Sequence, residues 1–217
     1  MKTIDYSGQN SILGQYLSQI RDKHMQKDSR RFRMNLERIG GFFASEISKT
    51  LNYKTIEVVT PLGIAQCNVP ADNLVVATIL RAGLPLHNGI MNVFDNAEGA
   101  FVTAYRKYGK GNEFDIRIEY VTSPSLEGKV LVLADTMLAT GASLLKAYQQ
   151  LLTYGEPSHT HFVCPISSRS AVEYLSKTLP HKKVTLWTAA IDEELTNKSY
   201  IVPGVGDAGD LCYGSKL

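Results

Sequence analysis

Residues 130–143 read VLVLADTMLATGAS, an apolar run followed by an acid, a stretch of small residues and the start of a helical pattern. The run is apolar at successive positions, which is typical of a strand that is covered on both faces of a parallel sheet. Open parallel sheets bind ligands at the carboxyl ends of their strands. We therefore expect Asp135 at a strand tip, a loop over 136–141 and a helix that begins near Ser143.

Other apolar runs rich in Val and Ile accompany this one. They are TIEVVT (55–60), NLVVATIL (73–80), GAFVTAY (99–105), THFVCPI (160–166) and KKVTLW (182–187). Helical patterns follow at 84–94, 143–152 and 168–179. Strands that alternate with helices predict an α/β fold, with a parallel sheet flanked by helices and joined by right-handed crossovers.

Three segments lie outside this alternation. The pattern at 12–20 predicts a short amphipathic helix, which would pack within the chain or make an oligomer contact. A longer helix is expected to begin at Asp28 or Ser29, so we expect the amino-terminal segment to be helical. Residues 114–120 alternate apolar and charged side chains, as in a strand with one wet face. With the turn at 108–112, this strand predicts a small flap or hood.

The composition excludes several classes of protein. The chain has 217 residues, of which 44% are hydrophobic and 20% charged, and its net charge is +2. We expect one globular domain over 1–217, with no nucleic-acid or membrane partner. The polar start and three widely spaced cysteines favour the cytoplasm.

The loop at 136–141 favours an anion. The N–H groups of the loop and of the first helical turn converge, Gly141 and Ala142 allow close approach, and Thr140 and Ser143 add hydroxyl donors. Asp135 would repel a phosphate unless it is aimed at sugar hydroxyls or acts through Mg²⁺. Neither GxxxxGK[ST] nor GxGxxG occurs in this loop, and a plain strand–turn–helix connection is the alternative.

Residues 200–210 read YIVPGVGDAGD, a turn-rich segment with few side chains. Its backbone groups would have to recognise a ligand, unless the glycines only build a turn. Asp207 lies between two small residues, so we expect it to be exposed, and therefore solvated, paired or functional. Asp210 is equally well explained as a side chain that stabilises the loop.

Two arginines follow predicted strands. Arg81 ends one apolar run and Arg106 ends another, which places both guanidinium groups at strand ends. Bidentate contacts of this kind suit phosphoryl oxygens, and a surface ion pair is the alternative.

These motifs together resemble the type I phosphoribosyltransferases, and in particular the uracil-specific family among them. The resemblance spans nearly the whole chain and rests on IRDK (20–23), RIG (38–40), ILRAGL (79–84), AYR (104–106), MLATG (137–141) and YIVPGVGDAGD (200–210). It implies transfer of a phosphoribosyl group from 5-phospho-α-D-ribose 1-diphosphate (PRPP) to uracil, which gives uridine monophosphate and diphosphate in pyrimidine salvage. Mg²⁺ would arrive with PRPP, without direct metal ligands from the protein.

The resemblance also assigns residues by motif. Arg81, Arg106 and Asp207 would act in catalysis. PRPP would be bound by Arg81, Arg106, Asp135, Thr136, Met137, Leu138, Ala139, Thr140, Gly141, Ala142, Ser143 and Asp207. Uracil would be bound by Tyr200, Ile201, Gly206, Asp207 and Ala208. Family members are commonly dimers or tetramers, so we expect a homo-oligomer, with GTP as a candidate effector.

The chain departs from the family pattern at three positions. Thr136 stands where proline is usual, Ala142 where glycine is usual and Leu211 where arginine is common. These changes concern the tightness of phosphate binding and regulation, and they remove no catalytic group. Two alternatives stay open: a non-catalytic nucleotide sensor, and a sister transferase for orotate or a purine.

Overall fold

The computed structural model describes residues 1–108, 114–179 and 183–215. Within them, seven strands form a central sheet in the order β1-β11-β9-β7-β4-β5-β6. All neighbours are parallel except β6, which runs antiparallel to β5 at the edge. The strands are β1 (Lys2–Asp5), β4 (Leu74–Leu80), β5 (Glu98–Tyr108), β6 (Phe114–Thr122), β7 (Val130–Ala134), β9 (His159–Val163) and β11 (Val184–Thr188). The predicted α/β class is confirmed.

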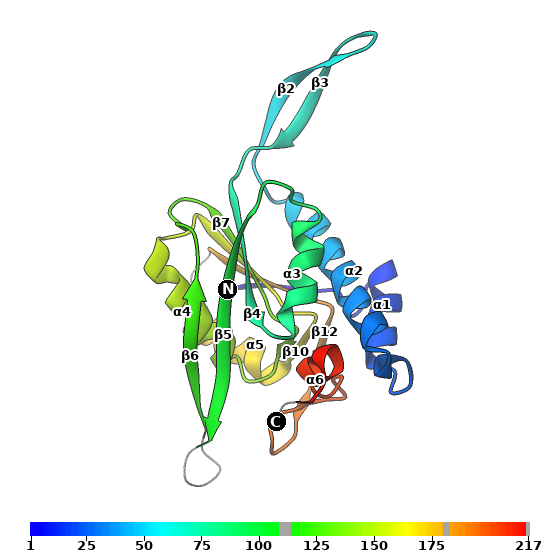
Figure 1. Ribbon diagram of the computed structural model, residues 1–217, viewed down its shortest axis with the longest axis vertical. Coiled ribbons are helices and arrows are strands. Elements are labelled where there is room, and N and C mark those ends of the chain that lie inside the picture. Colours follow the sequence, from blue (N-terminus) through cyan, green and yellow to red (C-terminus); the bar gives the residue numbers. More distant parts are fainter. Residues whose placement is uncertain (109–113, 180–182, 216–217) are drawn as a thin grey trace.

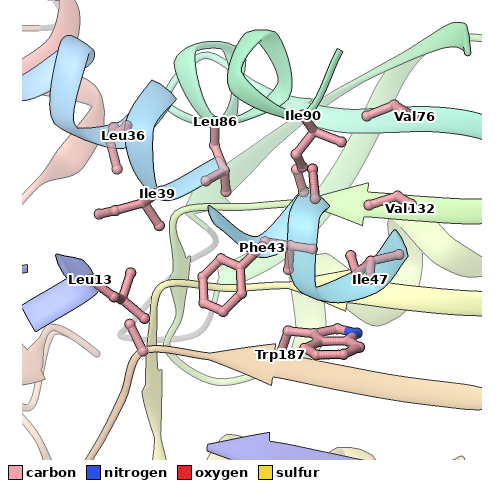
Figure 2. Close-up of a cluster of buried hydrophobic side chains, with 14 of the residues drawn as sticks. Leu13, Leu36, Ile39, Phe43, Ile47, Val76, Leu86, Ile90, Val132 and Trp187 are labelled. Atoms are coloured by element: carbon pink, nitrogen blue, oxygen red, sulfur yellow. The ribbon is translucent and has the colours of Figure 1, made fainter. Parts of the chain in front are cut away.

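Helices cover both faces of this sheet. One face packs against α1 (Ile12–Arg21), α2 (Ser29–Ser48) and α3 (Gly83–Met91), and Figure 2 shows their apolar side chains meeting the sheet. The other face packs against α4 (Ala142–Leu151) and α5 (Arg169–Thr178). The side chain of Asp28 accepts a hydrogen bond from the backbone N–H of Arg31, so the predicted cap of the long helix is confirmed.

The strands in the middle of the sheet alternate between these two cores. On β4, Val76 joins the core under α2 and α3, whereas Val75 and Ala77 join the core under α4. All three residues are 0% exposed. Burial on both faces explains why the run is apolar at successive positions rather than at every second one.

Short elements gather beyond the carboxyl ends of the strands. Three of them, β8 (Met137–Leu138), β10 (Ile166–Ser168) and β12 (Ala190–Asp192), form a small parallel sheet. A two-stranded ladder joins β13 (Glu194–Leu195) to β14 (Ile201–Val202), and the helix α6 (Ala208–Tyr213) follows. Two 3₁₀ turns lie at Met25–Lys27 and Leu152–Tyr154.

The assignment of 55–60 to the alternating parallel pattern is wrong. These residues belong to β2 (Tyr53–Thr60), which pairs antiparallel with β3 (Gly63–Pro70) and makes no pairing with the central sheet. Only two residues separate the strands, whereas a parallel pair needs a crossover of about a dozen or more. The hairpin projects from the end of the molecule opposite α6 (Figure 1). We call residues 53–70 the arm.

The alternating strand at 114–120 is confirmed as part of β6. Strand β6 pairs with β5, and the register of this pairing shifts between Thr103 and Ala104 of β5. Residues 109–112 of the predicted turn lie outside the described residues. No helix in the described part of the chain combines the length and the apolar character needed to cross a bilayer.

Helices α2 and α3 pack closely against each other at Gly40, in the RIG stretch. A Cβ atom at this position would lie 2.3 Å from the carbonyl oxygen of Leu86 and 3.2 Å from the Cα of Gly89. At the next residue, Gly41, a Cβ would meet its nearest atom at 3.7 Å, an ordinary contact. The two neighbouring glycines therefore differ sharply in the space around them.

We predict that Gly40→Ala lowers the free energy of unfolding by roughly 1–3 kcal/mol, because the helices must separate to admit the methyl group. Gly41→Ala is the matched control, and it should be neutral or stabilising by up to about 1 kcal/mol through helix propensity. Urea unfolding followed by circular dichroism measures both. Equal effects of the two substitutions would contradict the close packing.

Candidate active site

Two of the predicted site residues follow neighbouring strands at the same edge of the sheet. Strands β4 and β7 are adjacent, with Thr78 opposite Ala134. Asp135 comes directly after Ala134, and Arg81 comes three residues after Thr78. The topology therefore places the acid and the guanidinium-bearing residue at the carboxyl edge, as the sequence predicts.

The loop after β7 forms a small pocket. It is lined by Asp135, Met137, Leu138, Ala139, Thr140, Gly141, Ser143 and Leu144. Helix α4 begins at Ala142, one residue before the expected start; Gly141 at the N-cap offers no side-chain cap, and the hydroxyl of Thr140 accepts from the N–H of Ala142 at 3.4 Å. A helix start of this kind offers backbone N–H groups and a positive dipole end to an anion.

A side chain at Gly141 would be strained in this loop. Its φ is +80°, and a Cβ would lie 3.1 Å from the ring of Tyr174 and 3.3 Å from Leu175. Helix α5, which carries both residues, therefore supports the loop from beneath. The close approach of an anion that we expect at Gly141 stays a prediction.

Ser168 supports the same loop, and the sequence analysis assigned it no role. Its hydroxyl donates to the carbonyl oxygen of Ala139 at 2.5 Å and accepts from the N–H of Ala171 at 3.0 Å. Ser168 thereby links the start of α5 to the loop. A serine before a helical pattern indicates the cap, but the contact with Ala139, 29 residues away, has no local signal.

Asp135 lines this pocket and is half-buried. Burial raises the pKa of Asp135 to about 7, although hydrogen bonds from the backbone N–H groups of Thr136 and Met137 act in the opposite direction. Thr136 itself is 3% exposed and does not line the pocket. Near neutral pH, Asp135 can therefore accept or release a proton.

Residues 200–210, which we call the Gly-rich segment, are less exposed to solvent than expected. Gly206 is exposed, and Tyr200 is 43% exposed, but Ile201 and Ala208 are buried. Asp207 is half-buried, so the expectation that it is exposed is wrong. Its side chain accepts a hydrogen bond from the N–H of Asp210 at 3.0 Å and caps α6. This short helix was not predicted.

Arg81 reaches this segment. Its Nη2 donates to the carbonyl oxygen of Gly214 at 3.2 Å and lies 3.5 Å from a carboxylate oxygen of Asp210. Arg33 of α2 donates to the carbonyl oxygen of Cys212 and lies over the ring of Tyr213. The residue after β4 and the carboxyl-terminal segment are thus in direct contact.

The structure places the remaining predicted residues as follows. Arg106 lies in β5 opposite Ile116, and its side chain is outside the described part of the structure. Ala142 is not among the residues that line the pocket. Met137 and Ala139 pack against the apolar cluster that contains Ile201, Val205 and Ala208, which connects the loop to the Gly-rich segment. Leu211 packs against the same cluster.

A larger cavity of about 370 Å³ lies toward the amino ends of the strands. His159 and His161 line it, and the Nδ1 of His161 accepts from the indole N–H of Trp187 at 3.0 Å. Burial lowers the pKa of His161 to about 3, so its ring is neutral at physiological pH. Among the described residues, no group of three or more His, Cys, Asp or Glu side chains could hold a metal ion.

Comparison with known proteins agrees with this geometry. The family model described as uracil phosphoribosyltransferase matches residues 7–215. A uracil phosphoribosyltransferase of Porphyromonas gingivalis is 50% identical over 217 residues, which is 100% of both chains. One of Pyrococcus furiosus is 34% identical over 98% of this chain and 90% of its own. A solved structure of an Aquifex aeolicus protein superimposes with a TM-score of 0.87 at 28% identity, covering 99% of each chain.

The matched family model and the relatives are phosphoribosyltransferases, enzymes that transfer a pentosyl group. Within that class, the chain belongs to the uracil phosphoribosyltransferase family. Its reaction joins uracil to the phosphoribosyl group of PRPP and releases diphosphate. The full-length match to uracil enzymes favours neither a sensor nor a transferase for another base.

The raised pKa of Asp135 predicts a pH-dependent stability. The ordinary pKa is 3.8 and the folded value is about 7, so between these values the unfolded chain has lost a proton that the folded chain retains. The free energy of unfolding then falls as pH rises through this window. Asn has no such proton, so Asp135→Asn should become more stable relative to the parent between pH 5 and pH 8, by on the order of 2 kcal/mol.

Urea unfolding of both proteins at several pH values measures this difference. Asp72→Asn, at the base of the arm, serves as the control for a general effect of removing a carboxylate. A constant difference between Asp135→Asn and the parent over the whole range would contradict the raised pKa.

Proposed function

We propose that the chain works as one phosphoribosyltransferase domain in which three parts of the carboxyl edge divide the reaction among them. The loop after β7 binds the sugar phosphate, Arg81 and Arg106 receive the diphosphate, and residues 200–208 bind uracil. The observation that carries this proposal is the placement of the pocket, Arg81 and the Gly-rich segment along one edge, with shared apolar packing and direct contacts.

The pocket suits the 5-phosphate and the ribose. Backbone N–H groups at the start of α4, with the hydroxyl groups of Thr140 and Ser143, would donate to phosphate oxygens. The path from Thr136 to Ala142 would shape this pocket through its backbone. Asp135 would accept hydrogen bonds from the ribose hydroxyls, because a carboxylate at a strand tip is a good partner for two neighbouring hydroxyl groups.

The departing diphosphate gains negative charge as its bond to the anomeric carbon breaks. Arg81 and Arg106 would stabilise that charge with charge-assisted hydrogen bonds. The two loops hold the reactants in line, so positioning and electrostatics supply the catalysis and no covalent nucleophile is needed. The carbon passes through a state with oxocarbenium character.

Magnesium would enter as part of the substrate. The described residues include no cluster that fits a resident metal ion, whereas the oxygen donors of a diphosphate suit Mg²⁺ well. The ion would reduce the negative charge of the diphosphate. Asp135 is the protein carboxylate at the pocket that could meet a substrate-bound ion.

Uracil presents carbonyl groups and N–H groups along a flat edge. The backbone of Ile201, Gly206 and Ala208 would form hydrogen bonds with this edge. The ring of Tyr200 would form one side of the pocket. Asp207 is held at the start of α6 by its capping bond, which fixes its carboxylate between the base segment and the carboxyl-terminal helix. There it could orient PRPP or take a proton from uracil.

Exposed apolar side chains on the arm favour a homo-oligomer. Val59, Leu62 and Ile64 are 84%, 99% and 65% exposed, an unusual concentration of apolar surface at the tip of a hairpin. A second copy of the chain would cover these side chains, in a dimer or a tetramer. The family resemblance further supports GTP as an effector and the cytoplasm as the location.

We predict that Arg81→Ala raises the KM for PRPP by at least about tenfold, because a charge-assisted contact worth ~1.5–3 kcal/mol is lost. The KM for uracil should stay within about twofold. Arg169→Ala is a suitable control, since Arg169 also follows a strand and forms an exposed ion pair with Glu193 at 2.6 Å. An unchanged KM for PRPP would show that Arg81 serves only its contacts with Asp210 and Gly214.

Asp207→Asn preserves the shape of the side chain and an oxygen that can cap α6. We predict a normal melting temperature and a loss of at least a hundredfold in turnover, which corresponds to ~2.7 kcal/mol of barrier. Steady-state kinetics and thermal melting separate a catalytic defect from a folding defect. A stable and fully active variant would limit Asp207 to shaping the loop.

A further inference from the structure

One ion pair connects the amino-terminal helices to the carboxyl-terminal third of the chain. Arg21, in the IRDK stretch, is the last residue of α1, and Asp192 is the last residue of β12. Nη1 and Nη2 of Arg21 donate to the two carboxylate oxygens of Asp192 at 2.9 and 2.8 Å. The Asp192 side chain is 8% exposed and the Arg21 side chain 21%. This bidentate geometry fixes direction as well as distance.

Both partners also bind the backbone of Gly204. The N–H of Gly204 donates to Oδ2 of Asp192 at 2.9 Å, and its carbonyl oxygen accepts from Nη1 of Arg21 at 3.1 Å. Both polar backbone groups of this buried residue are therefore held by one ion pair. Gly204 has φ of +48°, and a Cβ there would lie 2.2 Å from the carbonyl oxygen of Ile201. Because Gly204 has no side chain and no room for one, other residues can hold it only through its backbone N–H and carbonyl groups.

Gly204 lies between the residues proposed to read uracil. On one side, Ile201 is held by pairing with Leu195, and on the other side Asp207 caps α6. Gly204 is anchored midway between these two fixed points by side chains from elements distant in the sequence. Displacements of about 1 Å can change a rate by about a hundredfold, so the position of this backbone matters for recognition of the base.

We propose that Arg21 and Asp192 are positioning residues for uracil: they hold the 201–208 backbone where it reads the base, without touching either substrate. This inference rests on the proposed assignment of 200–208 to uracil. The loop after β7, which is proposed to bind PRPP, is supported by a different contact, that of Ser168 with Ala139. Disturbing the ion pair should therefore affect the two substrates unequally.

Asp192→Asn tests the proposal. The amide group cannot reproduce both the bidentate contact with Arg21 and the acceptor for the N–H of Gly204. We expect the KM for uracil to rise at least about tenfold, a loss of about 1.4 kcal/mol, while the KM for PRPP changes less than about twofold. Arg21→Lys keeps the charge but loses the planar fork, so it should raise the KM for uracil in the same direction.

Two controls separate positioning from stability. Glu193→Gln breaks the neighbouring exposed ion pair with Arg169 and should leave both KM values unchanged. Gly40→Ala disturbs the contact between α2 and α3, so it shows what a general loss of stability does to the kinetics. Melting temperatures are measured for every variant.

Tyr200→Ala distinguishes the possible failures. If Tyr200→Ala raises the KM for uracil and Asp192→Asn does not, the base site stands and the positioning role is wrong. If neither variant changes it, the base assignment falls and the positioning role falls with it. Equal rises in both KM values, following the melting temperature as in Gly40→Ala, would make the ion pair purely structural and would also overturn the proposal.

Discussion

Burial of the parallel sheet on both faces is the constraint from which the rest of the molecule follows. Val75, Val76, Val132 and Leu133 are all 0% exposed, and helices lie over both sides. A polar ligand therefore cannot lie on a face of the sheet, and the strand ends are where polar backbone groups become accessible. At the carboxyl ends the chain turns into loops and helix starts, which present N–H groups and a favourable dipole to anions.

Loops at this edge need rigidity that their own residues cannot provide. Gly141 and Gly204 both have a positive φ, which favours glycine, and at Gly204 a Cβ would also collide with the carbonyl oxygen of Ile201. Each loop is held by side chains from elsewhere: Ser168 binds the carbonyl of Ala139, and the Arg21–Asp192 pair binds Gly204. The proposed recognition of a flat base by backbone groups would depend on these contacts, because they hold the backbone that would read it.

Periodicity predicted the elements whose burial is regular. Helix α2 and the order of strands and helices from 73 to 188 follow from it, because one-sided or two-sided burial leaves a clear pattern of apolar residues. The first strand of the arm was predicted at 55–60, but its antiparallel pairing outside the central sheet was not. Helix α6 escaped prediction because it is only six residues long. The Arg21–Asp192 contact spans 171 residues, so no local pattern could indicate it.

An acid beside a phosphate pocket is electrostatically awkward, and the environment of Asp135 resolves the difficulty. Burial raises its pKa to about 7, so a substantial fraction of the folded chain carries a neutral carboxyl group at this position near physiological pH. The neutral form does not repel an incoming phosphate. In the proposed assignment, ribose hydroxyl groups would donate to the carboxylate and favour its charged form, because hydrogen bonds to an ionised group lower its pKa. The same side chain would then tolerate the approach of PRPP and hold its sugar, so the proposed assignment is compatible with an acid in this loop.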